Sequence, residues 1–306
     1  MGKTYIFGHK NPDTDSIVSS LVMAEFEKRL GNKDAVACRL GMVNKETEYV
    51  LNYVGMEAPE LIEDLEDGAE VIIVDTANPG ELIPNLENVK IKRIVDHHQV
   101  KLNTAYPIFY RAEPVGCTET IMYKLYKEYG LEIDKKIATL MLSAIISDTL
   151  LLKSPTCTQE DKKILEELSK IAGIDYETYG MDMLKAGTDL SSFTIEQILS
   201  FDAKEIGLKD KKSIIAQVNT ASIPDVMKMQ SELEAGMNKI IKERNLDIYM
   251  LLITDIINSN TQTIVLGESA EIVERAYGVK LENNTAFLEG VVSRKKQVVP
   301  VMTENV

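Results

Sequence analysis

The first half of the chain alternates short apolar runs with longer segments whose apolar residues recur at helical spacing. The short runs predict strands at residues 4–8, 36–40, 70–75 and 91–96. The helical spacing between them predicts helices at residues 16–30 and 46–54. Alternation of strands with helices is typical of a mainly parallel sheet flanked by helices, so we expect an α/β domain here.

Farther along, helical patterns occupy residues 117–129, 135–149 and 158–172, after which residues 187–192 are polar and unpatterned. Beyond this segment, the pattern predicts strands at 212–218, 246–254 and 261–266, and one long helix at 224–244. We therefore predict an α/β protein of two domains. A first domain covers residues 1–187, a hinge covers 188–193 and a smaller α/β domain covers 194–306.

The apolar runs at residues 71–74 and 94–95 contain no polar alternation, which is typical of strands covered on both faces. Asp75 follows the first run and Asp96 follows the second. In open α/β folds, ligands bind at the carboxyl edge of the sheet, so both acids are expected at a binding edge. An ordinary turn-forming acid is the alternative for Asp75.

Composition limits the kind of substrate and compartment. The 306 residues are 44% hydrophobic, enough for two cores, and the formal net charge of −14 argues against a nucleic-acid partner and for a small substrate. Cys38, Cys117 and Cys157 are widely spaced, which suits a reducing cytosol. Without a signal-type segment or an apolar stretch of membrane-spanning length, we expect a soluble, cytoplasmic protein with no membrane partner.

All three histidines stand close to aspartates. His9 lies four residues before Asp13, and the pair His97-His98 directly follows Asp96. Imidazole and carboxylate groups together are a common ligand set for divalent transition metals, so the pattern indicates a metalloenzyme.

The segment from His9 to Asp15 gathers three ligand-type side chains, those of His9, Asp13 and Asp15, in one tight loop. Asn11-Pro12 breaks the chain there, just after a predicted strand. A turn with a helix cap would also explain the two acids.

The neighbours His97 and His98 point in different directions, so one can ligate a metal while the other faces substrate. Asp96 can hold an imidazole in the required tautomer. A purely structural pair of histidines is the alternative. Asp148 lies in a helix that is apolar on most of its circumference, where a buried carboxylate requires a cation. Exposure at a frayed helix end is the other explanation.

The second half offers a basic cluster at residues 293–297 between two apolar runs. A basic turn is usually a solvated loop, but in a chain this acidic a compact cationic cluster near a metal site suits phosphate oxygens. On its residues alone, Lys204 would be an ordinary surface lysine.

Together these features resemble the family II inorganic pyrophosphatases, the manganese-dependent branch of the DHH phosphoesterase superfamily. The likeness runs nearly end to end, through Asp75 and through residues 8–16, 96–98, 111–118, 143–148, 153–158 and 293–296. It implies a DHH metal-binding catalytic domain followed by a DHHA2-type substrate-binding domain. The chain is too short to hold the inserted nucleotide-binding modules of some members, so we expect no nucleotide regulation.

The resemblance implies two Mn²⁺ ions per subunit, with Co²⁺ as a possible substitute and Mg²⁺ entering with the substrate. One ion is held by His9, Asp13 and Asp75, and the other by Asp15, Asp75, His97 and Asp148, so that Asp75 bridges them. Asp96 is expected to orient an imidazole without binding the metal itself. The resemblance further implies a set of residues that contact pyrophosphate: His98, Lys204, Ser293, Arg294 and Lys295.

The implied function is hydrolysis of inorganic pyrophosphate to two phosphates by a water or hydroxide that bridges the two metals, in an active site between the domains. The residues expected to take part in catalysis are His98, Lys204, Arg294 and Lys295. His98 could help protonate the departing phosphate. The resemblance also suggests a homodimer formed through the first domain, by pairing of edge strands.

Two other functions remain open from the sequence. A different DHH-type phosphoesterase would act on short oligonucleotides or nucleotide phosphates, but its second domain should carry a glycine-rich segment with a histidine, and no histidine follows His98. A non-catalytic metal-binding or assembly protein should lack a ligand, and none is missing from the chain.

Overall fold

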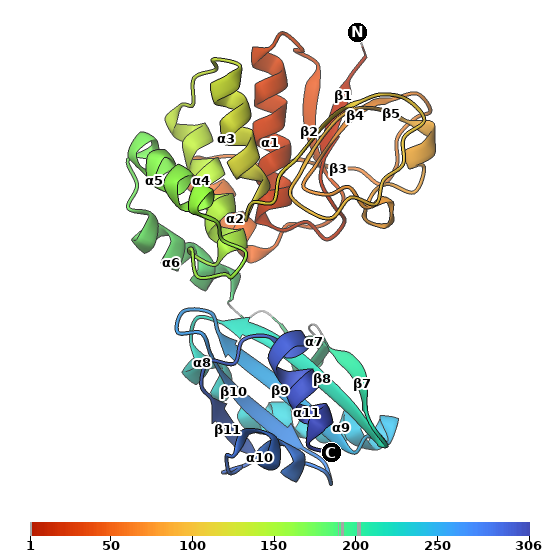
Figure 1. The fold of residues 1–306 in the computed structure, drawn as a ribbon, viewed down its shortest axis with the longest axis vertical. Coiled ribbons are helices and arrows are strands. Elements are labelled where there is room, and N and C mark those ends of the chain that lie inside the picture. Colours follow the sequence, from red (N-terminus) through yellow and green to blue (C-terminus); the bar gives the residue numbers. More distant parts are fainter. Residues whose placement is uncertain (1, 189, 191–192, 201–202) are drawn as a thin grey trace. The chain divides into compact units, whose positions relative to one another are not determined.

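The computed structural model describes residues 2–188, 190, 193–200 and 203–306. The chain divides into two compact units, Met1–Gly187 and Thr188–Val306, and each contains its own sheet (Figure 1). Within the predicted hinge, residues 189, 191 and 192 lie outside the described residues. In the described part of the chain, no helix is both long enough and apolar enough to cross a membrane.

The sheet of the first unit has six strands: β1 (Thr4–Phe7), β2 (Ala35–Arg39), β3 (Glu60–Leu61), β4 (Glu70–Val74), β5 (Lys90–Asp96) and β6 (Phe109–Ala112). Their spatial order is β3-β2-β1-β4-β5-β6, and every neighbouring pair is parallel. Strands β2 and β3 are added in turn on one side of β1, and β4, β5 and β6 are added in turn on its other side. The order therefore reverses between β1 and β4, the position where open α/β sheets bind ligands.

The first unit also contains six α-helices, of which the first two lie between strands and the other four follow β6: α1 (Thr14–Arg29), α2 (Lys45–Val54), α3 (Thr118–Glu128), α4 (Lys135–Thr149), α5 (Gln159–Ala172) and α6 (Tyr176–Gly187). Figure 1 shows them together on one side of the sheet. On the other side, Leu82 and Ile83 from the connection between β4 and β5 pack against Val71 and Ile73 of β4. Both faces of β4 are therefore buried, which explains its uninterrupted apolar sequence.

The second unit has a mixed sheet of β7 (Lys204–Leu208), β8 (Lys211–Thr220), β9 (Ile248–Asp255), β10 (Asn260–Leu266) and β11 (Thr285–Leu288). The order is β11-β10-β9-β8-β7, with β8 and β9 parallel and the other pairs antiparallel. Helices α7 (Ile195–Ser200), α8 (Ile223–Met227) and α9 (Gln230–Arg244) pack on one face. Helices α10 (Glu271–Tyr277) and α11 (Val299–Glu304) pack on the other.

The predicted fold class is confirmed, and α4 begins and ends where the pattern placed it. The single helix predicted at residues 224–244 is wrong, because the chain forms α8 and α9 with a break at Lys228 and Met229. The backbone of Met229, with φ −97° and ψ 14°, leaves the helical conformation there, while Val226 of α8 and Leu233 of α9 pack against the same core. The pattern also missed four short strands (β3, β6, β7 and β11) and four helices (α6, α7, α10 and α11).

Candidate metal centre

The loop between β1 and α1 carries His9 and Asp13, two side chains of the first candidate ligand group. Gly8 is required at its start, because a Cβ there would lie 2.1 Å from the Oγ of Ser16. Asn11 adopts a left-handed backbone with φ 52°, and Asp13 then caps α1 by accepting a hydrogen bond of 3.0 Å from the backbone N–H of Ser16. The loop thus folds tightly over the carboxyl end of β1, where His9 lies.

His9, Asp13 and Asp75 come together at the point where the strand order reverses. The Nε2 atom of His9 lies 3.5 Å from Oδ2 of Asp13 and 3.4 Å from Oδ2 of Asp75. Ligand atoms of all three residues lie within 4.8 Å of one another. Asp75 directly follows β4, so two adjacent strand ends and one helix start supply this group.

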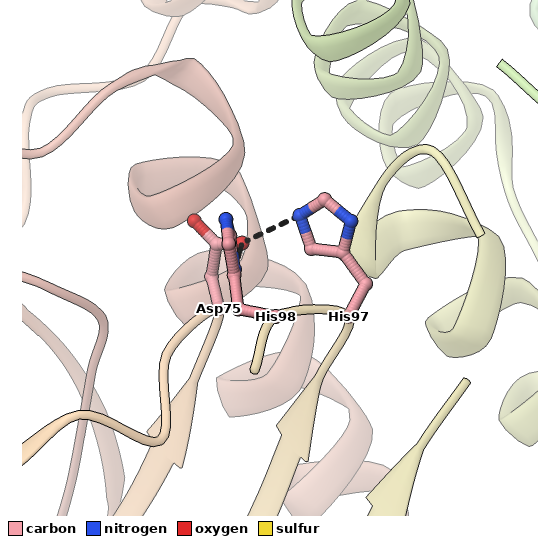
Figure 2. A group of neighbouring side chains, drawn as sticks. All are labelled: Asp75, His97 and His98. Carbon is pink, nitrogen blue, oxygen red and sulfur yellow. Dashed lines mark ion pairs between the residues drawn. The ribbon is translucent and has the colours of Figure 1, made fainter. Parts of the chain in front are cut away.

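A second group consists of Asp15, Asp75, His97 and Asp148, whose ligand atoms also lie within 4.8 Å of one another. The Nε2 atom of His97 is at its centre, 3.5 Å from Oδ1 of Asp75, 3.4 Å from Oδ2 of Asp148 and 4.0 Å from Oδ2 of Asp15. Figure 2 shows the ring of His97 facing Asp75 from the end of the neighbouring strand. Asp75 belongs to both groups, one oxygen toward each.

The buried atoms of these groups fit a cation. Oδ2 of Asp75 and Nε2 of His97 are buried without a hydrogen-bond partner in the described structure. The Nδ1 atom of His97 lies 3.0 Å from the carbonyl oxygen of Val115, so Nδ1–H donates there and the lone pair of Nε2 faces the carboxylates. Buried polar atoms are costly unless they are paired, and a metal ion between them would supply the pairing.

The charges of the carboxylates and histidines act strongly on one another. Burial disfavours the charged form of His97, but the nearby carboxylates of Asp75 and Asp15 prevail and raise its pKa to about 9. Burial likewise opposes the charged form of His9, yet the carboxylates of Asp13 and Asp75, at 3.5 and 3.4 Å from its Nε2, raise its pKa to about 11.

Two of the three carboxylates of the second group, those of Asp148 and Asp75, have pKa values shifted in opposite directions. Burial and repulsion from Asp15 and Asp75 raise the pKa of Asp148 well above its ordinary value. The pKa of Asp75 is lowered despite its burial, because the imidazoles of His9 and His97 lie 3.4 and 3.5 Å from its oxygens. Opposed shifts within one buried cluster are the electrostatic signature of a functional site, and divalent cations would balance the excess negative charge.

About half of the His98 side chain is exposed, and its Nδ1 lies 3.7 Å from Oδ1 of Asp75, so Asp75, His97 and His98 form a third possible ligand group. Oδ1 of Asp96, a fully buried carboxylate at the end of β5, accepts hydrogen bonds from the backbone N–H of His98 at 2.9 Å and from its Nδ1 at 3.0 Å. The bond to Asp96 raises the pKa of His98, which favours a protonated ring with Nε2 free to contact a ligand.

Thr118, at the start of α3, supports both groups. Its hydroxyl donates to Oδ1 of Asp75 at 3.0 Å, and its backbone N–H donates to Oδ2 of Asp15 at 2.7 Å. In the sequence, Thr118 ends the family-like segment 111–118, and no role was predicted for it. Its contacts are with residues far away along the chain, so no local pattern could have revealed them.

Within the second unit, Lys204 and Arg294 both lie beside Ile215. Lys204 begins β7 and pairs with Ile215 of β8, and the guanidinium of Arg294 donates to the carbonyl oxygen of Ile215 at 3.4 Å. Ser293 caps the turn that follows by accepting a bond of 3.2 Å from the backbone N–H of Lys296. The side chain of Lys295 lies outside the part of the chain that the structure describes.

Two family models match this chain. The DHH family, N-terminal domain, covers residues 3–145, and the DHHA2 domain covers residues 181–305. A parallel sheet with histidines and carboxylates at its switch point, followed by a DHHA2 domain, defines the class: a DHH-type protein with a candidate metal centre.

Similar proteins of known name show to which family of DHH-type proteins the chain belongs. The manganese-dependent inorganic pyrophosphatase of Bacillus subtilis (strain 168) and a probable one of Bacillus velezensis are each 52% identical to the chain over 306 residues, covering 99% of both sequences. The crystal structure of a putative family II inorganic pyrophosphatase from Methanococcus jannaschii is 40% identical, covers 99% of both chains and has a TM-score of 0.68. The chain belongs to the family II, manganese-dependent inorganic pyrophosphatases, and the resemblance seen in the sequence is confirmed.

Proposed function

We propose that this protein hydrolyses inorganic pyrophosphate to two phosphates with the help of manganese. The observation that carries the proposal is the pair of ligand groups that share Asp75, in a chain related over nearly its whole length to manganese-dependent inorganic pyrophosphatases. A shared carboxylate holds two metal sites close together, as hydrolysis of phosphate anhydrides by two metals requires.

The first ion would be held by His9, Asp13 and Asp75, and the second by Asp15, Asp75, His97 and Asp148. Imidazole ligands beside carboxylates suit Mn²⁺ or Co²⁺ better than Mg²⁺ in these sites. When bound, such ions polarise phosphoryl oxygens and lower the pKa of coordinated water. Mg²⁺ would arrive with pyrophosphate as a counter-charge for its oxygens.

The chain's own residues would bind and orient the substrate. Asp96 fixes the ring of His98 through Nδ1, so its Nε2–H can donate to an oxygen of the leaving phosphate and pass a proton to it. The raised pKa of His98 supports this role because the ring must be protonated beforehand.

The cationic residues of the second unit would neutralise the remaining charge of pyrophosphate. The pairing of β7 with β8 and the bond from Arg294 to Ile215 support a joint role for Lys204 and Arg294. Arginine can grip two phosphate oxygens at once, whereas lysine acts as a point charge. We include Ser293 and Lys295 in this set from their place in the family-like segment. The proposal thus assigns the metal ligands to a domain of residues 1–187 and the cationic substrate contacts to a domain of residues 194–306, with a hinge over 188–193.

We further propose a cytoplasmic homodimer that does not bind nucleic acid. Strand β6 is an edge of the first sheet and exposes Phe109 and Tyr110, which supports pairing with a second copy there. The three free cysteines suit a reducing compartment. The net charge of −14 favours a small substrate over a polyanion.

The proposed activity is tested by removing metal from the protein, reloading it with Mn²⁺ plus Mg²⁺ and measuring phosphate release from pyrophosphate beside cleavage of a short oligonucleotide. Asp75→Asn keeps the left-handed backbone, which asparagine tolerates, and removes the shared charge. We expect hydrolysis to fall more than about 100-fold, beyond the loss seen when only an outer partner of a ligand is changed.

Asp64→Asn, at an exposed aspartate, is the matched control and should behave as the unaltered protein does. Consumption of the oligonucleotide with pyrophosphate left intact would move the protein to the other DHH-type phosphoesterases. Binding of Mn²⁺ without turnover of either substrate would favour a non-catalytic role.

A further inference from the structure

Glu119 is a buried acid that the proposed reaction does not use. It is the second residue of α3, and its side chain is fully buried. Its Oε2 atom has no hydrogen-bond partner in the described structure, and its Oε1 atom lies 2.9 Å from the hydroxyl oxygen of Ser19. A buried carboxylate normally requires a cation, but the charged groups that act on Glu119 are the carboxylates of Asp15 and Asp75.

Ser19 connects Glu119 to the metal centre. Its Oγ atom lies 2.9 Å from Oε1 of Glu119 and also 2.9 Å from Oδ1 of Asp15. A serine hydroxyl has only one proton to donate. Two ionised carboxylates would therefore compete for that proton. If one of the acids carries its own proton, it donates to Ser19, which in turn donates to the other acid, and both contacts become complete hydrogen bonds.

The surroundings of the two acids decide which one carries the proton. Burial and repulsion from Asp75 raise the pKa of Asp15 to about 7. The nearby His97, whose Nε2 lies 4.0 Å from Oδ2 of Asp15, and a bond of 2.7 Å from the backbone N–H of Thr118 act in the opposite direction and favour its ionised form. Glu119 has no such support, and burial followed by repulsion from Asp15 raises its pKa well above the ordinary value. The positive end of α3 favours the anion, but by less than the cost of burying an unpaired charge.

We propose that Glu119 is a positioning residue of the metal centre: as a neutral acid it donates to Ser19, and Ser19 holds Oδ1 of Asp15 so that Oδ2 faces His97. The bond to Ser19 fixes the orientation of Asp15 before a cation binds. The unpartnered Oε2 of Glu119 is then a carbonyl oxygen, which is far less costly to bury than half of a carboxylate. The inference rests on the metal centre proposed above.

Infrared difference spectroscopy tests the neutral state without reference to turnover. The Mn²⁺-loaded protein at neutral pH is compared with Glu119→Gln, since bound metal keeps the ligand aspartates ionised. We expect a carboxylic-acid C=O band that shifts in D₂O and disappears in the variant. Glu128→Gln, on the same helix at an exposed glutamate paired with Arg111, should leave that band in place. If the unaltered protein shows no such band, Glu119 is ionised and the inference fails.

Manganese affinity, measured by calorimetry, tests the positioning role. The amide of Glu119→Gln still donates to Ser19 and should preserve affinity, whereas Glu119→Leu should weaken it about tenfold, as loss of an outer partner typically does. Ser19→Ala cuts the same connection from α1, and its effect should not add to that of Glu119→Leu. Unchanged affinity in both Glu119→Leu and Ser19→Ala would overturn the role. Because neither measurement follows pyrophosphate, failure here is distinguishable from failure of the proposed function.

Discussion

Asp75 is held in a conformation that aspartate rarely adopts. Its φ is 58°, and its side chain is buried, so the strained backbone is maintained by its neighbours. The backbone N–H of Asp75 donates to the carbonyl oxygen of Val95 at 2.9 Å, and Thr118 bonds to Oδ1. Strain of this kind costs about 1–3 kcal/mol and allows one carboxylate to serve two ligand groups.

Replacing Thr118 with valine should separate the role of its hydroxyl from that of its backbone. Thr118→Val keeps the shape and the N–H that bonds to Asp15, but it leaves Oδ1 of Asp75 without its donor. We expect manganese affinity to fall about tenfold, measured by calorimetric titration.

Thr120→Val is the control for this change. Thr120 lies on the same helix and bonds to Asp161, away from the metal centre. The substitution Thr120→Val should reduce the free energy of unfolding by about 1 kcal/mol and leave the affinity for manganese unchanged. Equal affinities for Thr118→Val and the unaltered protein would show that the hydroxyl does not orient Asp75.

At the scale of the elements, Glu46 connects three helices around the metal centre. Its Oε1, at the start of α2, accepts a bond of 2.7 Å from Thr14 of α1 and one from Ser147 of α4. Thr14 stands between Asp13 and Asp15, and Ser147 directly precedes Asp148. One carboxylate therefore ties together the helix ends that carry three ligand-type side chains.

Glu46→Ala should loosen these helix ends. The hydroxyls of Thr14 and Ser147 would lose their shared acceptor in a buried setting, so we expect the free energy of unfolding to fall by about 2–3 kcal/mol in urea titrations. Glu48→Ala, on the same helix at a glutamate paired with Lys45 on the surface, should cost less than about 1 kcal/mol. Similar losses for both variants would contradict the connecting role of Glu46.

Strand β6 and helix α3 are joined by charges that make stability depend on pH. Burial opposes ionisation of Glu113, but bonds from Lys124 and Arg111 prevail and lower its pKa. A lowered folded-state pKa stabilises the protein above the unfolded value of about 4.3, and this contribution is lost as the pH falls through the folded value.

The free energy lost in Glu113→Gln should therefore be constant from pH 6 to 8, at about 1 kcal/mol or less for a partly exposed pair. It should shrink toward zero as the pH is lowered below about 4. Urea unfolding of both proteins across this range measures the difference. A loss that does not change with pH would show that the charge of Glu113 is not the cause.

How far the sequence predicts each element depends on burial. Strands β4 and β5 were found from their apolar runs, whereas the edge strands β6 and β7 are largely exposed and give no pattern. The positions of His9 and Asp75 followed from strand ends in a parallel sheet. The supporting roles of Thr118, Glu46 and Glu119 depend on contacts between distant segments, which one sequence without its fold does not contain.

At the scale of the whole molecule, the ligand-type groups found in the described structure all lie in the first unit. The residues of these groups are spread along the sequence from His9 to Asp148. A bound ion would therefore hold together segments from most of the first unit. An ion that binds only the folded state stabilises it by about 2.7 kcal/mol at a concentration of 100 times Kd.

Hydrogen exchange followed by peptide should show where this stabilisation acts. Adding Mn²⁺ to the metal-free protein should slow exchange at the ends of β1, β4 and α4 in residues 1–187. Peptides from β9 and β10 in the second unit should change little, since those strands carry none of the ligand-type groups. Protection gained equally in both units would show that metal binding is not confined to the first.

The strand order β3-β2-β1-β4-β5-β6 also bears on how the protein is made. During synthesis His9 emerges early, but neither ligand group is complete until Asp75 has paired beside it, and the second also needs His97 and Asp148. A parallel sheet assembles through long-range contacts and folds slowly for that reason. The nascent chain therefore offers a metal no complete site, so we expect metal binding to follow folding of the first unit and to stabilise it afterwards.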